Sequence, residues 1–157
     1  MRILVLSDSH GRTNVIDKIL SEQPETEYVF FLGDKTSDIE DFEFIYPQKQ
    51  FFVVCGNCDY CSSYPSVSVA NVCGKRILFT HGHNFSVKYG TQRLLAAAKE
   101  NNYDIVLFGH THIPTTLYED GVYLVNPGSC GNSGEGAPSY AVIDITDSGV
   151  MPIIIRI

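Results

Sequence analysis

Short, continuous apolar runs alternate with helical periodicity through the first third of the chain. The runs cover residues 3–6, 28–32 and 51–54. Runs of this length are typical of strands buried on both faces of a parallel sheet. Between the first two, Ile16, Ile19 and Leu20 form one face of a helix that ends before Pro24. This alternation predicts right-handed crossovers and three parallel strands.

A second helix is expected between the second and third runs. Ser37 and Glu40 have the spacing of a capping box, which predicts that the helix begins at Ser37. Ile39, Phe42 and Ile45 then give it an apolar side.

Hairpins replace this alternation after residue 60. The expected elements are strands 67–72 and 76–80, a helix over 91–101, strands 105–108, 115–119 and 122–125, a glycine-rich loop over 131–138, and strands 140–145 and 151–157. Asp120-Gly121 is a favoured hairpin turn. Because the strands are too many for one modest sheet, we predict two packed sheets with helices on their outer faces.

The run Ile153-Ile154-Ile155 lacks alternation. It is expected either to be buried on both faces by a helix or to form part of a subunit contact, and the sequence leaves both open.

Composition narrows the class of protein. The chain has 157 residues, 44% of them hydrophobic, and is expected to form a single domain over residues 1–157. No window approaches the ~18 apolar residues of a membrane span and no cleavage site follows Met1, so we expect a cytoplasmic protein. Eleven basic and 18 acidic residues give a net charge of -7, which argues against long nucleic acid as a partner.

The cysteines do not indicate a disulfide framework, because five is an odd number. Cys55, Cys58 and Cys61 have a C-x2-C-x2-C spacing, but the continuation typical of an iron–sulfur site is missing and Cys73 lies far downstream. Cys55 also ends an apolar run, where a reduced cysteine is an ordinary core residue.

Polar side chains with metal-binding chemistry follow the apolar runs. The chain has five histidines, and all of them lie just after such runs. The candidates at the strand ends are Asp8, His10, Asp34, Asn57, His81, His110 and His112. In α/β sheets, ligands collect outside the carboxyl ends of the strands. These oxygen and nitrogen donors are about enough for two divalent cations, and a set without thiolate suits Mn²⁺, Fe or Zn²⁺.

The order of these blocks resembles the calcineurin-like metallophosphoesterases, and most closely their minimal YfcE-like phosphodiesterase branch. The matching blocks are Asp8-Ser9-His10, Gly33-Asp34, Gly56-Asn57-Cys58-Asp59, Thr80-His81-Gly82-His83, Gly109-His110-Thr111-His112 and Asn126-Pro127-Gly128-Ser129. The resemblance implies an α/β fold, a four-layer sandwich of two mixed β-sheets flanked by α-helices. It also implies a dinuclear metal-dependent phosphodiesterase that hydrolyses small phosphate esters through a metal-bridging hydroxide.

The same resemblance implies a role for each block. Asp8, His10, Asp34 and His112 would hold the first metal, and Asp34, Asn57, His81 and His110 the second. Asp8, Asp34, Asn57 and His110 are the expected catalytic residues. Two divalent ions are implied, with Mn²⁺ favoured and Fe, Zn²⁺ or Ni²⁺ as alternatives. We expect no membrane partner, and the sequence leaves open whether the chain forms a homo-oligomer.

Four further residues are expected to contact substrate or to support the ligands. Many family members have a histidine after the asparagine of the third block, thought to protonate the leaving group, and Cys58 stands there instead. Asp59 would act either as that acid or by orienting a ligand. His83 would support a ligand or contact substrate, whereas Arg12 is equally compatible with phosphate contact and with an exposed helix start.

Two other function classes compete with this hypothesis. A non-catalytic scaffold is known in the family, a retromer subunit that has lost critical histidines, but every candidate ligand is present here. A phosphomonoesterase or a nuclease is the alternative among enzymes.

Overall fold

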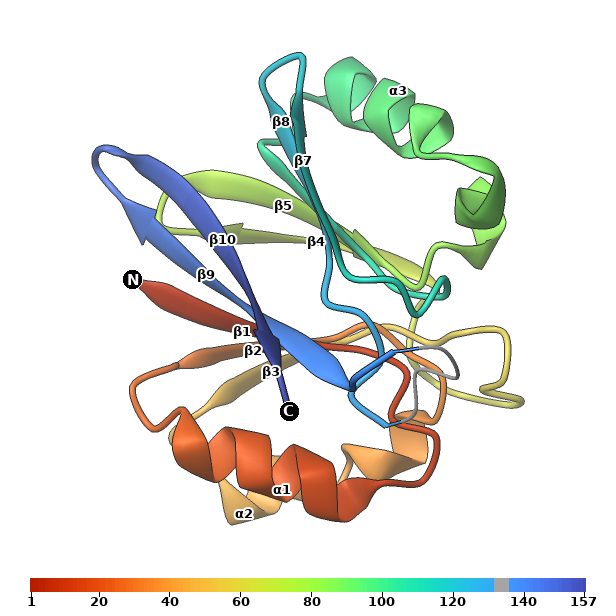
Figure 1. Ribbon diagram of the computed structural model, residues 1–157, viewed down its shortest axis with the longest axis vertical. Helices are drawn as coiled ribbons and strands as arrows, with labels where there is room; N and C mark the ends of the chain where they lie inside the picture. The colour runs from red at the N-terminus through yellow and green to blue at the C-terminus, as the bar shows by residue number, and fades with distance from the viewer. Residues whose placement is uncertain (132–135) are drawn as a thin grey trace.

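The computed structural model describes residues 1–131 and 136–157 and shows four layers (Figure 1). The layers are a pair of helices, two five-stranded sheets and a third helix. The glycine-rich loop predicted over 131–138 lies partly outside the described residues. Among those residues, no helix combines the length and the apolar character needed to cross a membrane.

The first sheet holds the N-terminal strands and the C-terminal hairpin. Its strand order is β10-β9-β1-β2-β3, formed by β1 (Arg2–Leu6), β2 (Tyr28–Phe31), β3 (Gln50–Val53), β9 (Ser139–Thr146) and β10 (Gly149–Arg156). β1, β2 and β3 are parallel, as predicted, whereas β9 is antiparallel both to β1 and to β10.

The second sheet has the order β4-β5-β6-β8-β7. Its strands are β4 (Val67–Val72), β5 (Lys75–Thr80), β6 (Ile105–Phe108), β7 (Thr115–Glu119) and β8 (Val122–Asn126). The central strands β5, β6 and β8 are parallel, and β4 and β7 are antiparallel edges. The prediction of two mixed sheets flanked by helices is therefore confirmed.

Three apolar cores lie between the four layers. Residues of both sheets, such as Val5 and Ile77, form the core between them. The helices α1 (Thr13–Glu22) and α2 (Phe42–Ile45) cover the outer face of the first sheet, and α3 (Gln92–Asn101) covers that of the second (Figure 1). Sheets buried on both faces explain why the central strands are continuously apolar.

The prediction of a helix capped by Ser37 is wrong. Residues Thr36–Asp38 form a short 3-10 helix without a side-chain cap, and α2 has only four residues. The amide groups of Lys35 and Thr36 donate instead to Asp59, so these orphan donors need no local cap. Ile45 is exposed, unlike the apolar side predicted for it.

The isoleucine run near the C-terminus belongs to the edge strand β10. Ile154 packs on the core between the sheets, Ile155 packs toward α1, and Ile153 is partly exposed. The expectation of burial on both faces by a helix is therefore wrong, and a subunit contact stays a prediction.

Two short 3-10 helices follow β5. They cover His83–Phe85 and Val87–Tyr89 and lead into α3. His83, at the start of this segment, lies beside His81.

Candidate metal centre

Six of the seven predicted ligands lie at strand ends and have donor atoms that gather in two groups. One group contains Asp8, His10, Asp34 and His112, and the other contains Asp34, His81 and His110. Within each group the donor atoms lie within 4.8 Å of one another. Asp34 belongs to both. The two sheets therefore bring together residues that are more than one hundred positions apart in the chain.

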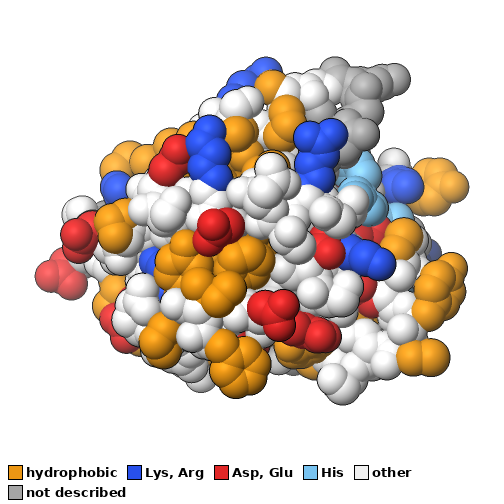
Figure 2. Space-filling view, turned by 90° about the horizontal axis from the view of Figure 1, so that it is seen from below, with side chains coloured by type: hydrophobic (Ala, Val, Ile, Leu, Met, Phe, Trp, Pro, Cys, Tyr) orange, Lys and Arg blue, Asp and Glu red, His pale blue; other side chains and the backbone are white. Residues whose placement is uncertain are grey.

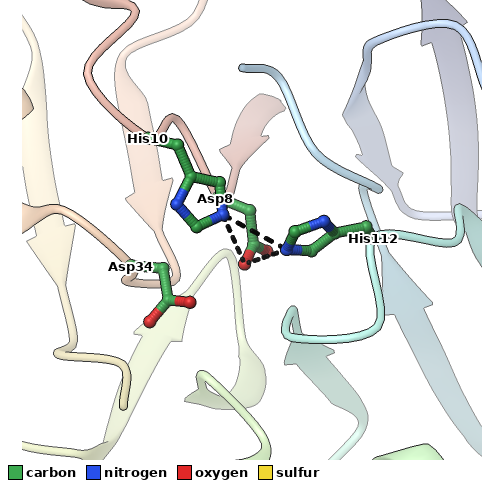
Figure 3. A group of neighbouring side chains, drawn as sticks. All are labelled: Asp8, His10, Asp34 and His112. Atoms are coloured by element: carbon green, nitrogen blue, oxygen red, sulfur yellow. Dashed lines mark hydrogen bonds and ion pairs between the residues drawn. The ribbon is translucent and has the colours of Figure 1, made fainter. Parts of the chain in front are cut away.

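The first group surrounds the carboxylate of Asp8 (Figure 3). Its Oδ1 lies 3.0 Å from His112 Nε2 and 3.9 Å from His10 Nε2. The two Nε2 atoms are 3.3 Å apart. In the described part of the chain, the buried Oδ1 has no hydrogen bond of acceptable geometry. A buried carboxylate oxygen facing two imidazole nitrogens is the arrangement expected around a cation.

The second group centres on the buried His81. Its Nδ1 lies 2.8 Å from the carbonyl oxygen of Leu32, which makes Nδ1 the protonated nitrogen and leaves Nε2 as a lone-pair donor. That Nε2 lies 3.4 Å from Asp34 Oδ1 and 3.1 Å from His110 Nδ1. The donor atoms of these three residues thus lie within 4.8 Å of one another.

Asn57, the seventh predicted ligand, lies beside this group. It follows Gly56, where an added Cβ would collide with Asp34 Oδ1, and precedes Cys58, whose amide donates to the same oxygen at 3.0 Å. The backbone on both sides of Asn57 therefore touches the carboxylate that the two groups share. Only glycine permits this approach at position 56.

The backbone at the site is unusual. Five of the predicted ligands have positive φ angles between 47° and 68°, namely Asp8, His10, Asp34, His110 and His112. Residues other than glycine adopt this region uncommonly, and such residues cluster at functional sites. The turns that place these side chains at the strand ends are thus held by the surrounding fold.

A network of hydrogen bonds holds Asp8 in place. The Ser7 hydroxyl and the amide of His110 donate to its Oδ2. A Cβ at Gly109 would collide with Ser7 Oγ, so the β6 loop can approach β1 only with glycine there. With Oδ2 occupied in this way, Oδ1 is the oxygen that faces the imidazoles.

Burial and neighbouring charges shift the pKa values of four residues at the site. Burial opposes ionisation of Asp34, but the contacts with His81 and the Cys58 amide outweigh it and lower the Asp34 pKa far below its usual range. Burial likewise opposes protonation of His81, and Asp34 and Asp8 nevertheless raise its pKa. The neighbouring Asp8 carboxylate raises the pKa of His112. Burial, together with the charges of His81 and Lys88, lowers the pKa of His110 to about 4.

Cys58 and Asp59 have clearly different surroundings. Burial and the nearby Asp34 carboxylate raise the pKa of the Cys58 thiol, so it is protonated and a weak acid at neutral pH. The Asp59 carboxylate accepts four backbone N–H bonds. Oδ2 accepts from Asp34 and Gly56 at 2.9 and 2.7 Å, and Oδ1 accepts from Lys35 and Thr36 at 2.8 and 2.7 Å. Of the two roles predicted for Asp59, the geometry favours orienting a ligand.

His83 and Arg12 lie at the margin of the site. The His83 ring centroid is 5.5 Å from that of His81 and 6.2 Å from that of His110, and burial with the His81 charge lowers its pKa. Arg12 is exposed and precedes α1 without a side-chain cap bond. His83 is therefore placed to support ligands, whereas the position of Arg12 remains compatible with both expectations.

Two residues with positioning roles were not predicted. The Asn126 amide donates to the Gly109 carbonyl at 2.9 Å and to the Thr111 hydroxyl at 3.0 Å, and so fixes the loop that carries His110 and His112. The Ser129 hydroxyl donates to the Asp8 carbonyl at 2.7 Å. The sequence contained a signal for these roles. Asn126 is a polar residue at the end of a buried strand, and residues 126–129 form one of the blocks that resemble the family.

The donor groups reach the surface at one edge of the molecule. Figure 2 shows histidine side chains there, with basic and acidic side chains close by. Mixed carboxylate and imidazole donors, one unsatisfied buried oxygen and a shared carboxylate fit a pair of divalent cations.

The fold is that of a metallophosphoesterase. The profile of the calcineurin-like phosphoesterase superfamily domain matches residues 1–148, and the chain belongs to this family. Particular relatives support the YfcE-like branch. The chain is 35% identical to the phosphodiesterase YfcE of Escherichia coli K12, in an alignment covering 92% of this chain and 88% of YfcE.

Two other similarities bear on function. A crystal structure of a predicted phosphoesterase from Streptococcus pneumoniae superposes with a TM-score of 0.83 at 28% identity, covering 99% of this chain and 88% of the other. Vacuolar protein sorting-associated protein 29 of Schizosaccharomyces pombe is 31% identical over 64% of this chain and 51% of its own length.

Proposed function

We propose that this protein is a metal-dependent phosphodiesterase that hydrolyses small phosphate esters at a dinuclear centre. The observation that carries the proposal is the pair of donor groups that share Asp34. Two-metal sites of this kind serve phosphoryl transfer in many phosphatases and nucleases. The similarity to a relative named as a phosphodiesterase favours diesters.

Each donor group would hold one ion. The first ion would be held by Asp8, His10, Asp34 and His112, and the second by Asp34, Asn57, His81 and His110. When bound, such ions act as Lewis acids on phosphate oxygens and lower the pKa of water. The oxygen and nitrogen donors, without thiolate, favour Mn²⁺, with Fe, Zn²⁺ and Ni²⁺ as alternatives.

The charges of the chain's own residues favour an anionic substrate. Asp8 and Asp34 are the only two carboxylates in the proposed ligand set, so two divalent ions would leave a positive balance. Asn57 would add an oxygen donor without adding negative charge. An otherwise acidic protein of net charge -7 would in this way attract a phosphate ester to one place.

The residues at the position of the usual acid would not protonate a leaving group. The Cys58 thiol has a raised pKa, and both oxygens of Asp59 are engaged by backbone amides. The reaction would therefore depend on esters whose leaving group departs as a stable anion. Aryl esters meet this condition better than simple alkyl esters.

The direct test combines metal analysis with hydrolysis of a model diester and its matching monoester, with and without added Mn²⁺. We expect about two ions per chain and faster hydrolysis of bis(p-nitrophenyl) phosphate than of p-nitrophenyl phosphate. His112→Ala and Asn57→Ala should abolish turnover in folded protein, because the lost contacts act on the transition state and not on the core. Asn71→Ala, on an exposed strand of the second sheet, is the matched control. A folded His112→Ala protein with full activity would refute the assignment.

One observation favours a second candidate, a scaffold for protein interaction. It is the similarity to vacuolar protein sorting-associated protein 29. The two candidates differ in metal loading and turnover: a scaffold would show no metal-dependent hydrolysis of either ester.

A further inference from the structure

A cavity of about 500 Å³ lies next to the candidate metal centre. One wall is the segment with Val87 and Lys88, and the other is the loop from Thr111 to Thr115. Thr111, one of the lining residues, stands between the two predicted ligands His110 and His112 in the sequence. Its volume is within the range of roughly 300–1,000 Å³ found for small-molecule sites.

The lining is mostly apolar with one positive charge. Val87 and Phe108 form buried walls, and Ile113, whose side chain is 65% exposed, forms part of the rim. Lys88 is the charged residue in the lining, and none of the described lining residues is acidic. Apolar walls with few convergent polar groups are typical of sites for organic ligands.

The ammonium group of Lys88 is available for a ligand. Lys18, Lys75 and Lys99 each pair with a carboxylate, but Lys88 has no ion pair within the described residues. A cation in the lining of an apolar cavity would bind an anionic group attached to an apolar one.

We infer that this cavity binds an organic substituent of the phosphate ester, an apolar group of aryl size that carries its own negative charge toward Lys88. The inference rests on the proposed function, since the phosphate itself would be held at the metal centre. It narrows the substrate class to esters of anionic aryl or similarly flat alcohols. An apolar group in the cavity would lose contact with water on the walls formed by Val87, Phe108 and Ile113.

Phosphonates test the inference because they bind without turnover. Binding of methylphosphonate, phenylphosphonate and 4-carboxyphenylphosphonate to the Mn²⁺-loaded protein is measured by titration calorimetry. We expect phenylphosphonate to bind on the order of tenfold more tightly than methylphosphonate, because the ring buries additional apolar surface. The added carboxylate should strengthen binding several-fold further through Lys88.

Variants test which residue causes each gain in phosphonate affinity. Ile113→Asp should abolish the preference for the phenyl group, while Ile153→Asp on β10 should leave it unchanged. Ile113 is 65% exposed and Ile153 is 38% exposed, so neither variant buries a full charge in a core and both should fold. Lys88→Gln should abolish only the gain from the carboxylate, and Lys18→Gln on α1 should not. Equal affinities for the methyl and phenyl compounds, or equal effects of Ile113→Asp and Ile153→Asp, would overturn the inference.

The two proposals fail in different ways. If the protein hydrolyses the model diester and binds methylphosphonate without preferring the phenyl compound, only the cavity assignment is overturned. If the metal-loaded protein hydrolyses no ester and binds none of the phosphonates, the proposed function is refuted and the cavity assignment with it.

Discussion

The Asp59 carboxylate offers a sharp test of how the site is built. Its two oxygens accept two backbone N–H bonds each, at 2.7–2.9 Å, from Asp34, Gly56, Lys35 and Thr36. Asp59→Asn keeps one acceptor oxygen and places an NH₂ group against two amides, so it loses two of the four bonds. Hydrogen bonds to a charged acceptor contribute roughly 1.5–3 kcal/mol each. Because the Lys35 side is exposed to water, we use the lower value and expect a loss of about 3 kcal/mol.

The same substitution should also weaken metal binding. Asp59 fixes the amide of Asp34 itself, and residues that orient a ligand typically change metal affinity by about 10–100-fold. The assays are urea denaturation of the metal-free protein and titration calorimetry with Mn²⁺. Asp147→Asn, in an exposed turn, is the matched control and should change neither value.

The alternative role of Asp59 gives the opposite pattern. If it were the general acid, Asp59→Asn would keep the stability and the Mn²⁺ affinity of the original protein. Its turnover would then fall most for esters with poor leaving groups. That result would refute the positioning role and the interpretation of the four hydrogen bonds.

Three further predictions concern the dependence of the rate on the leaving group, the dependence of stability on pH, and the packing at Gly109. With the Cys58 thiol protonated and weak, rates across a series of diesters should rise steeply as the leaving-group pKa falls; equal rates would contradict this. The metal-free protein should be most stable at about pH 6.5, the ordinary pKa of histidine. Stability falls toward lower pH because His110, whose pKa in the folded protein is about 4, takes up a proton on unfolding. Stability also falls toward higher pH, because the contribution from the raised pKa of His112 is lost there. Thermal melts between about pH 5 and pH 8 at roughly one-unit steps check this. Gly109→Ala, whose added Cβ would collide with Ser7 Oγ, should destabilise the protein by more than about 3 kcal/mol in urea denaturation or prevent folding.

The strands and their functional ends could be predicted because their signals are local. A buried run such as Ile105–Phe108 needs only its own residues to be identified, and the polar residue after it then lies at the sheet edge. Parallel strands place such residues side by side, which is why scattered histidines and carboxylates could be grouped from the sequence alone.

The parts that could not be predicted depend on contacts between distant segments. Ser37 and Glu40 have the spacing of a capping box, but the local amides donate to Asp59, which belongs to the following strand–loop unit. The role of Asn126 depends likewise on the position of the Gly109 carbonyl beneath it. Spacing along the chain identifies neither Asp59 nor the Gly109 carbonyl as the hydrogen-bond partner.

The left-handed backbone at the predicted ligands indicates what holds the site in the metal-free protein. Non-glycine residues in this region cost of order 1 kcal/mol each at the low end, and five of them sit at the candidate centre. Their sum is comparable to the roughly 5–15 kcal/mol by which a domain of this size is stable. Such turns persist only if the surroundings determine them. Here hydrogen bonds from Ser7, Asn126 and Ser129, at or beyond the ends of β1 and β8, hold two of the segments. The donor groups should therefore keep their arrangement in the metal-free protein, and ions would bind a largely preformed site.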